Sequence, residues 1–186
     1  MLNPIIQALA KTKSILKALG ITVENIFFTT AFFTGLILTC FEIDLYRLTF
    51  IPFFIPFSIW IFSGLTITPF LFKILPKYLK INSLFQQLVF NILTWGGIFL
   101  YLFMALNFYY TAPNRSSISL TITNKGTLAK GRSGCGEPYV IVKHDNFEKQ
   151  IVLPCGTSTD GFKAIDLTLR KGFFGFDIIE YKTLSK

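Results

Sequence analysis

The sequence predicts an α+β membrane protein in which three transmembrane α-helices precede a small antiparallel β domain. Of the 186 residues, 52% are hydrophobic and 22 are Phe, which is more than a small soluble domain can bury. Three long stretches contain no charged side chain, and charged, Gly-rich sequence with alternating apolar residues begins at Ala112. We therefore expect an amphipathic helix at 1–20, a transmembrane region at 21–111 and an extracytoplasmic β domain at 112–186.

The first twenty residues have the pattern of an amphipathic helix rather than that of a signal peptide. They contain neither a continuous apolar core nor a small-residue cleavage site. On a helix of 100° per residue the apolar side chains share one arc, and Lys11, Lys13 and Lys17 lie on the other. We expect this helix to lie in the cytoplasmic interface of the membrane with its lysines toward anionic headgroups, or to pack against a partner there.

Three segments of the predicted transmembrane region are long and apolar enough to cross a bilayer as helices. A helix needs about 20 apolar residues to cross the hydrocarbon core of a bilayer. The core helices of a large soluble protein can be as apolar, but a chain of 186 residues offers nothing that could cover three of them. The expected spans are residues 21–41, 48–72 and 84–110.

Small and polar residues within these spans indicate where the helices could contact one another. Small side chains allow two helices to approach closely, although they can also simply be tolerated at such positions. The small residues are Ala31, Gly35, Gly96 and Gly97. The third span also contains polar side chains that we interpret as interhelical hydrogen-bonding groups, namely Asn91, Thr94 and Asn107. Because the uncharged stretches supply no ionisable relay, we do not expect proton or ion translocation by this chain alone.

The loops between the spans predict the orientation of the chain in the membrane. Lys and Arg together number three before the first span, one in the first loop and three in the second loop. The positive-inside rule therefore puts the N-terminus and the second loop in the cytoplasm. Three crossings then put everything after Tyr110 outside. We expect a multi-pass protein of the bacterial inner membrane with a periplasmic β domain.

Alternating apolar and polar residues after Ala112 predict a β domain of five or six strands. Strict alternation is typical of a strand with one buried face, and Gly or Asn-Asp clusters between such runs are typical of turns. The clearest strands are 118–122, 139–143, 147–153, 165–169 and 174–181. We expect them to form an antiparallel sandwich or a partly open barrel.

Cys135 and Cys155 are expected to form a disulfide. Cys135 precedes one strand of a predicted hairpin and Cys155 follows the next, so both lie at the same end of it. Cysteine pairs in an oxidising extracytoplasmic compartment persist as disulfides, and closing a loop of this length stabilises a fold by about 3 kcal/mol. A metal site would need His144 as a ligand, but His144 lies at the opposite end of the hairpin, too far from both thiols to share one ion. A redox pair of cysteines is usually separated by two residues, which is not the spacing here. We expect no metal and no cofactor, and Cys40 is expected to be a free, packed thiol.

No motif in the sequence indicates catalysis. Neither a nucleophile elbow nor a phosphate-binding loop is present, and no motif identifies a family. The carboxylates Glu42 and Asp44 lie on the expected outer loop, where we interpret them as solvated. The net charge of +8 comes from scattered lysines rather than from a basic face with aromatics, which argues against nucleic-acid binding.

A cluster of phenylalanines near the C-terminus is the candidate partner surface. Phe173, Phe174 and Phe176 lie at the start of the expected last strand, beside Gly172 and Gly175. In one interpretation Phe174 and Phe176 fill the core of the β domain while Phe173 meets the membrane surface. In the other, the three side chains form a patch that docks a partner.

These features favour a non-enzymatic accessory or structural subunit of a larger bacterial envelope complex. Its expected contacts are the lipid bilayer and a protein partner, with no small-molecule substrate identified. An extracytoplasmic ligand-binding or sensor module is the first alternative, and it would need a pocket in the β domain. The second alternative is a membrane enzyme that acts at the outer interface through Glu42, Asp44 and His144.

Overall fold

The computed structural model describes residues 22–130, 134–144 and 147–186, and the chain forms two compact units. The first unit combines the described residues up to Thr39 with Ser58–Phe99. The second unit combines Cys40–Phe57 with Leu100–Lys186. The amphipathic helix expected at 1–20 lies outside the described residues.

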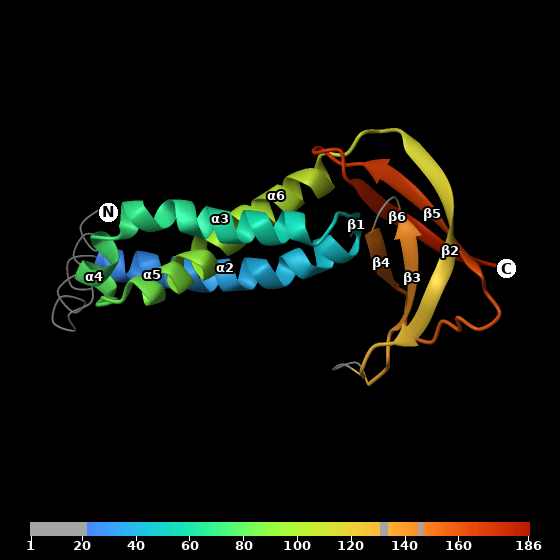
Figure 1. Cartoon of the computed structure of the whole chain (residues 1–186), viewed down its shortest axis with the longest axis horizontal. Helices are drawn as coiled ribbons and strands as arrows, with labels where there is room; N and C mark the ends of the chain where they lie inside the picture. Colours follow the sequence, from blue (N-terminus) through green and yellow to red (C-terminus); the bar gives the residue numbers. More distant parts are fainter. Residues whose placement is uncertain (1–21, 131–133, 145–146) are drawn as a thin grey trace, which may run out of the picture. The chain divides into compact units, whose positions relative to one another are not determined.

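The helical segments confirm the three predicted spans. In chain order (Figure 1), they are α2 (Val23–Arg47), α3 (Phe54–Leu71), α4 (Ile74–Leu79), α5 (Leu84–Asn91), the π-helical turn η1 (Ile92–Gly96) and α6 (Gly97–Tyr109). Three continuous helices, Val23–Arg47, Phe54–Leu71 and Leu84–Tyr109, are long and apolar enough to cross a membrane.

Two helix ends differ from the expected spans. The first span was expected to end at 41, but α2 continues to Arg47 and therefore includes Glu42 and Asp44. The second span was expected to begin at 48, but residues 49 and 50 form a short strand and α3 begins at Phe54. Pro52 has no N–H to extend that strand, and its carbonyl accepts the first helical hydrogen bond, from the N–H of Ile55.

In the first unit, α2 contacts the segment from η1 to α6 through glycines. A Cβ atom on Gly35 would lie 2.4 Å from the carbonyl oxygen of Thr94, and one on Gly97 would lie 2.5 Å from the carbonyl oxygen of Gly35. No larger residue fits at these positions without moving a backbone. The small residues Gly35 and Gly97 are therefore at helix contacts, as their size predicts.

The same π-helical turn also packs against α3. A Cβ atom on Gly64 would lie 2.5 Å from the Cα of Ile92, and one on Gly96 would lie 2.4 Å from the carbonyl oxygen of Trp60. A single π-helical turn inside an α-helix is rare, and it widens the backbone locally. The segment from η1 to Gly97 thus contacts both α2 and α3 closely, and Gly64 is a contact that was not predicted from the sequence.

Polar side chains are fully buried beside these glycine contacts. Gln87, Asn91 and Thr94 are all 0% exposed. The Nδ2 of Asn91 donates a hydrogen bond of 3.1 Å to the Oγ1 of Thr68 on α3, so Asn91 is an interhelical hydrogen-bonding group as predicted. The Nε2 of Gln87 donates to the carbonyl of Ile81 at 3.0 Å.

The second unit contains a six-stranded antiparallel, nearly closed barrel. The strands (Figure 1) are β1 (Thr49–Phe50), β2 (Arg115–Thr127), β3 (Pro138–His144), β4 (Phe147–Val152), β5 (Ala164–Lys171) and β6 (Asp177–Ser185). They are ordered β1-β6-β5-β2-β3-β4, with every neighbouring pair antiparallel. Side chains span the gap between the edge strands β1 and β4. The ring of Phe50 on β1 lies 4.8 Å from that of His144 at the end of β3 and 6.3 Å from that of Phe147 on β4.

The barrel core is built from the alternating residues that predicted the strands. On β5 the side chains of Ile165, Leu167 and Leu169 are each at most 2% exposed. Across the β3–β4 hairpin Val140 is paired with Ile151, and both are buried. Alternation at period two therefore gave the correct inward face of these strands.

The last strand begins later than the sequence predicts. We expected a strand at 174–181, but β6 starts at Asp177 and the preceding residues form the β5–β6 turn. Within this turn the N–H of Gly172 donates to the carbonyl of Phe176 at 2.9 Å, and Gly175 has a φ of +84°. Glycine adopts this backbone conformation without strain, so the chain can turn at Gly175. The pairing of β5 with β6 therefore begins only at Asp177, opposite Lys171.

Candidate functional site

The β5–β6 turn carries the phenylalanines predicted as a partner surface. Phe173 is 64% exposed and Phe174 is 42% exposed, while Phe176 is half-buried. The ring of Phe174 stacks on Phe103 of α6 at 4.6 Å with an interplanar angle of 16°, and Phe176 meets the same ring at 6.2 Å. Phe174 and Phe176 therefore pack against α6 and lie outside the cluster that forms the barrel core.

Asn107 of α6 holds this turn in place. Its side chain is 0% exposed, and its Oδ1 accepts a hydrogen bond of 3.0 Å from the N–H of Phe174. Its Nδ2 donates to the carbonyl of Phe176 at 3.4 Å, and its own carbonyl accepts from the N–H of Phe173 at 3.3 Å. A Cβ atom on Gly172 would lie 2.4 Å from the Oδ1 of Asn107, so a larger residue there would displace the Asn107 side chain from its bonds to the turn. The interhelical role expected for Asn107 is wrong, because its partner is a turn of the barrel.

Lys149 makes a second buried polar contact between the barrel and a helix. It lies on β4 and is 3% exposed. Its Nζ donates a hydrogen bond of 2.6 Å to the carbonyl of Tyr46 and lies 3.6 Å from the centroid of the Tyr46 ring. Burial lowers the pKa of Lys149 from 10.5 to about 8, and the negative charge of Glu42 acts in the opposite direction.

Glu42 is not the solvated loop residue that the sequence analysis expected. It is 7% exposed and lies on the last turns of α2, together with Tyr46. Lys149 was not among the predicted site residues, although its position carries a signal. Lys149 alternates with Phe147 and Ile151, so its position on β4 predicts a side chain on the inward face.

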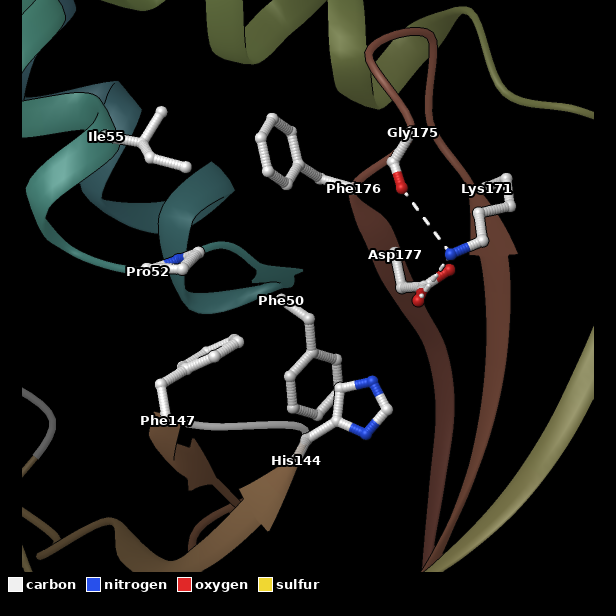
Figure 2. A pocket seen from close by; sticks show the side chains of 9 residues that line it. All are labelled: Phe50, Pro52, Ile55, His144, Phe147, Lys171, Gly175, Phe176 and Asp177. Atoms are coloured by element: carbon white, nitrogen blue, oxygen red, sulfur yellow. Dashed lines mark hydrogen bonds and ion pairs between the residues drawn. The ribbon is translucent and has the colours of Figure 1, made fainter.

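A cavity of about 330 Å³ lies in the second unit, beside the gap between the barrel edges (Figure 2). Its lining combines aromatic and aliphatic side chains with one ion pair, in which the Nζ of Lys171 lies 2.9 Å from the Oδ2 of Asp177. His144 lines the cavity with its ring against Phe50 and is half-buried. The lining residues are Phe50, Pro52, Ile55, His144, Phe147, Lys171, Gly175, Phe176 and Asp177.

Cys135 and Cys155 form a disulfide in the structure. Their Cα atoms are 6.2 Å apart, and the bond joins the segment before β3 to the segment after β4. Within the described residues there is no group of three or more His, Cys, Asp or Glu side chains that could hold a metal ion. Cys40 is a free thiol, but it is exposed rather than packed as the sequence analysis expected.

Of the three residues proposed for an outer-interface enzyme, Asp44 and His144 line different cavities. Glu42 is buried near Lys149, and Asp44 is exposed. Comparisons of the chain with protein-family models, with curated proteins and with solved structures found no match. The function is therefore inferred from the contacts described above, which join barrel strands to helix ends.

Proposed function

We propose that this chain is a non-enzymatic integral membrane protein of the bacterial inner membrane. In this proposal it is an accessory or structural subunit that displays a disulfide-bonded barrel in the periplasm to a protein partner. The observation that carries the proposal is the fixed attachment of the barrel, through Asn107 and Lys149, to the ends of α6 and α2. These partly buried hydrogen bonds hold the barrel against the ends of helices that are proposed to enter the membrane.

The surfaces of the long helices support the lipid bilayer as their surroundings. Large apolar side chains are exposed along them, including Phe33 at 57%, Phe62 at 65% and Phe70 at 76%. Exposing such side chains to water costs free energy, whereas exposing them to acyl chains does not. A monomeric soluble protein rarely exposes continuous apolar surface of this extent.

Charge and redox chemistry support the proposed orientation. Lys73, Lys77 and Lys80 flank or lie on α4, the helix that connects the second and third candidate spans. Positive loops remain in the cytoplasm, and one further crossing from there reaches the barrel. The disulfide is consistent with an extracytoplasmic barrel, because the bacterial cytoplasm keeps thiols reduced.

Reporter fusions test the location. Alkaline phosphatase fused after Lys186 should be active and green fluorescent protein fused there should be dark, since the former folds in the periplasm and the latter in the cytoplasm. Fusions after Lys80 should give the opposite pair of results. A fluorescent fusion at Lys186 would overturn the periplasmic placement.

Co-purification from native membranes after mild crosslinking tests the accessory role. A defined partner should purify with the wild-type chain and with Cys40→Ser, which removes only the free thiol. The partner should be lost when Cys135 and Cys155 are both replaced by Ser, because the presenting barrel is then destabilised. A chain that is always recovered as a lone monomer contradicts the accessory role.

A ligand-binding module is the second candidate, and the cavity in Figure 2 is the observation that favours it. Its volume of about 330 Å³ lies at the lower end of the range for small-molecule sites. A ligand with both an apolar part and a polar group would match the aromatic rings, His144 and the Lys171–Asp177 ion pair. Thermal shift of the detergent-purified protein with envelope metabolites tests it, because binding should raise the unfolding temperature and Phe147→Ala should abolish the rise.

A further inference from the structure

The depth of the β5–β6 turn is fixed by α6. Three hydrogen bonds join the turn to Asn107, which lies within the candidate span Leu84–Tyr109 near its C-terminal end. The Asn107 side chain is fully buried, and its two bonds to the turn are partly buried. Wherever the end of α6 lies relative to the bilayer, the turn must lie at the same depth.

The backbone of the turn is suited to a medium without water. The N–H groups of Gly172 and Gly175 donate within the turn, to Phe176 and Gly172, each at 2.9 Å. The N–H groups of Phe173 and Phe174 donate to Asn107. Four consecutive N–H groups are thus satisfied by protein, as the donors of irregular backbone must be at membrane depth.

The exposed side chains of the turn itself are aromatic and uncharged, and the ion pair of Lys171 with Asp177 flanks the turn at the ends of β5 and β6. Phe173 lies beside Tyr110, with ring centroids 6.5 Å apart, and Tyr109 and Tyr110 are 68% and 67% exposed. On α6 itself Leu106 and Leu102 are exposed about one and two turns before this cluster, respectively. The apolar surface of the candidate span therefore continues directly onto the turn, and tyrosines are typical of the bilayer interface.

We infer that the β5–β6 turn inserts Phe173 and Phe174 into the acyl chains of the outer leaflet, so that the barrel has its own anchor in the lipid. This inference rests on the proposed membrane integration of α6. It assigns two of the three phenylalanines of the candidate partner surface to lipid, and a protein partner then binds elsewhere on the barrel.

Spin labels in lipid nanodiscs test this inference. In a Cys40→Ser background, Phe173→Cys is labelled on the intact, disulfide-bonded protein. Leu106→Cys on α6 is the lipid reference, and Tyr181→Cys is the matched control because Tyr181 is an aromatic residue on β6 that is 62% exposed, against 64% for Phe173. Collision rates with oxygen, which concentrates in acyl chains, and with a water-soluble nickel chelate report the surroundings of each label.

The expected result is that the label at 173 collides with oxygen several-fold more than with the nickel chelate, as the label at 106 does, while the label at 181 shows the reverse. A label at 173 that behaves like the one at 181, with 106 still in lipid, overturns the inference and leaves the proposed function standing. A nickel-accessible label at 106 overturns membrane integration itself. A label at 173 that is accessible to nickel in nanodiscs but protected in native membranes identifies a protein partner in place of lipid.

A second variant tests whether Asn107 sets the depth. Asn107→Ala removes both side-chain hydrogen bonds to the turn, so the label at 173 should become more mobile and more accessible to nickel. An unchanged label contradicts the positioning role of Asn107. If the variant loses its barrel, as judged by a disulfide that becomes easily reducible, the wild-type comparison of labels at 173, 106 and 181 still decides the inference.

Discussion

The contacts within the first unit differ in kind from the contacts within the second unit. In the first unit the closest contacts between helices occur at glycines, where a backbone oxygen or Cα of one helix occupies the space of an absent Cβ. In the second unit the barrel is joined to helix ends by two fully or almost fully buried polar side chains, Asn107 and Lys149. The helix contacts of the first unit depend on residue size, whereas the junction between the barrel and the helix ends in the second unit depends on hydrogen bonding.

This difference follows from the surroundings that each unit needs. Helices in lipid gain little from hiding apolar side chains from one another, so close backbone packing supplies the attraction. A barrel joined to helix ends must bury polar backbone at the junction, and each buried polar group costs free energy unless it is paired. A change of residue size should therefore damage the first unit most, and a change of polarity should damage the second.

The largest effect is expected from Gly35→Leu. Its Cβ would meet the carbonyl oxygen of Thr94 at 2.4 Å, and a backbone atom cannot move aside as a side chain can. We expect a loss of at least about 3 kcal/mol in the free energy of unfolding, at the upper end of the range for overpacking. Both tryptophans of the chain, Trp60 and Trp95, belong to the first unit, so their fluorescence during SDS titration measures this loss.

Thr34→Leu is the control for this substitution. Thr34 precedes Gly35 on the same helix and is exposed, so the same added bulk should change the SDS midpoint little. Equal losses for the two variants would mean that the glycine contact does not hold the first unit together.

Removing the disulfide should weaken the second unit alone. With Cys135 and Cys155 both changed to Ser, we expect the barrel to lose about 3 kcal/mol, the loss expected for a loop of this length. Hydrogen exchange of the amides of β3 and β4 should accelerate, while the SDS midpoint from tryptophan fluorescence should stay the same. A shift of that midpoint by the same amount would show that the units unfold together, and the comparison would fail.

The structure could be predicted from the sequence where a periodic or local pattern decides it. The three spans follow from uncharged length, and the inward faces of β3 and β5 follow from alternation at period two. The cysteine pairing followed from the hairpin, since both residues lie at one end of it. Each of these predictions needs only residues that are close in the chain.

The parts that could not be predicted depend on distant residues. Strand β1 has two residues, and its partner β6 lies at the other end of the chain, so no local pattern identifies it. Glu42 was interpreted as solvated because the positive charge that lies near it, Lys149, is more than 100 residues away in the sequence. The β5–β6 turn had a local signal in Gly172 and Gly175, but its contact with Asn107 had none.

A pH titration should sharpen the role of Lys149. The unfolded chain keeps the Lys149 proton up to a pKa of about 10.5, whereas the folded protein releases it at about 8. Between these values the unfolded state binds more protons, so the free energy of unfolding should rise with pH and stay flat below 8. From pH 8 to 9.5 the free energy of unfolding should rise by about 2 kcal/mol. Hydrogen exchange of the barrel amides measures this rise.

Lys149→Met is the matched variant for this titration, because it keeps the length and loses the charge. Its stability should lack that rise between pH 8 and 9.5. Lys182, whose pKa is also lowered by burial, is present in both proteins and cancels in the comparison. The same slope in both proteins would contradict the burial of a charged Lys149.

The smallest effect should come from a polar contact in the first unit. Thr68→Val preserves volume but removes the acceptor of the 3.1 Å hydrogen bond from Asn91, and interhelical bonds of this kind contribute about 0.6 kcal/mol in lipid. Thr66→Val is its control, because the Thr66 hydroxyl is exposed and bonds only within its own helix, to the carbonyl of Phe62 at 2.7 Å. The two SDS midpoints should differ by no more than this small amount. A loss of several kcal/mol at Thr68 alone would mean that buried polar contacts hold the first unit as well, and shape would no longer distinguish it from the second.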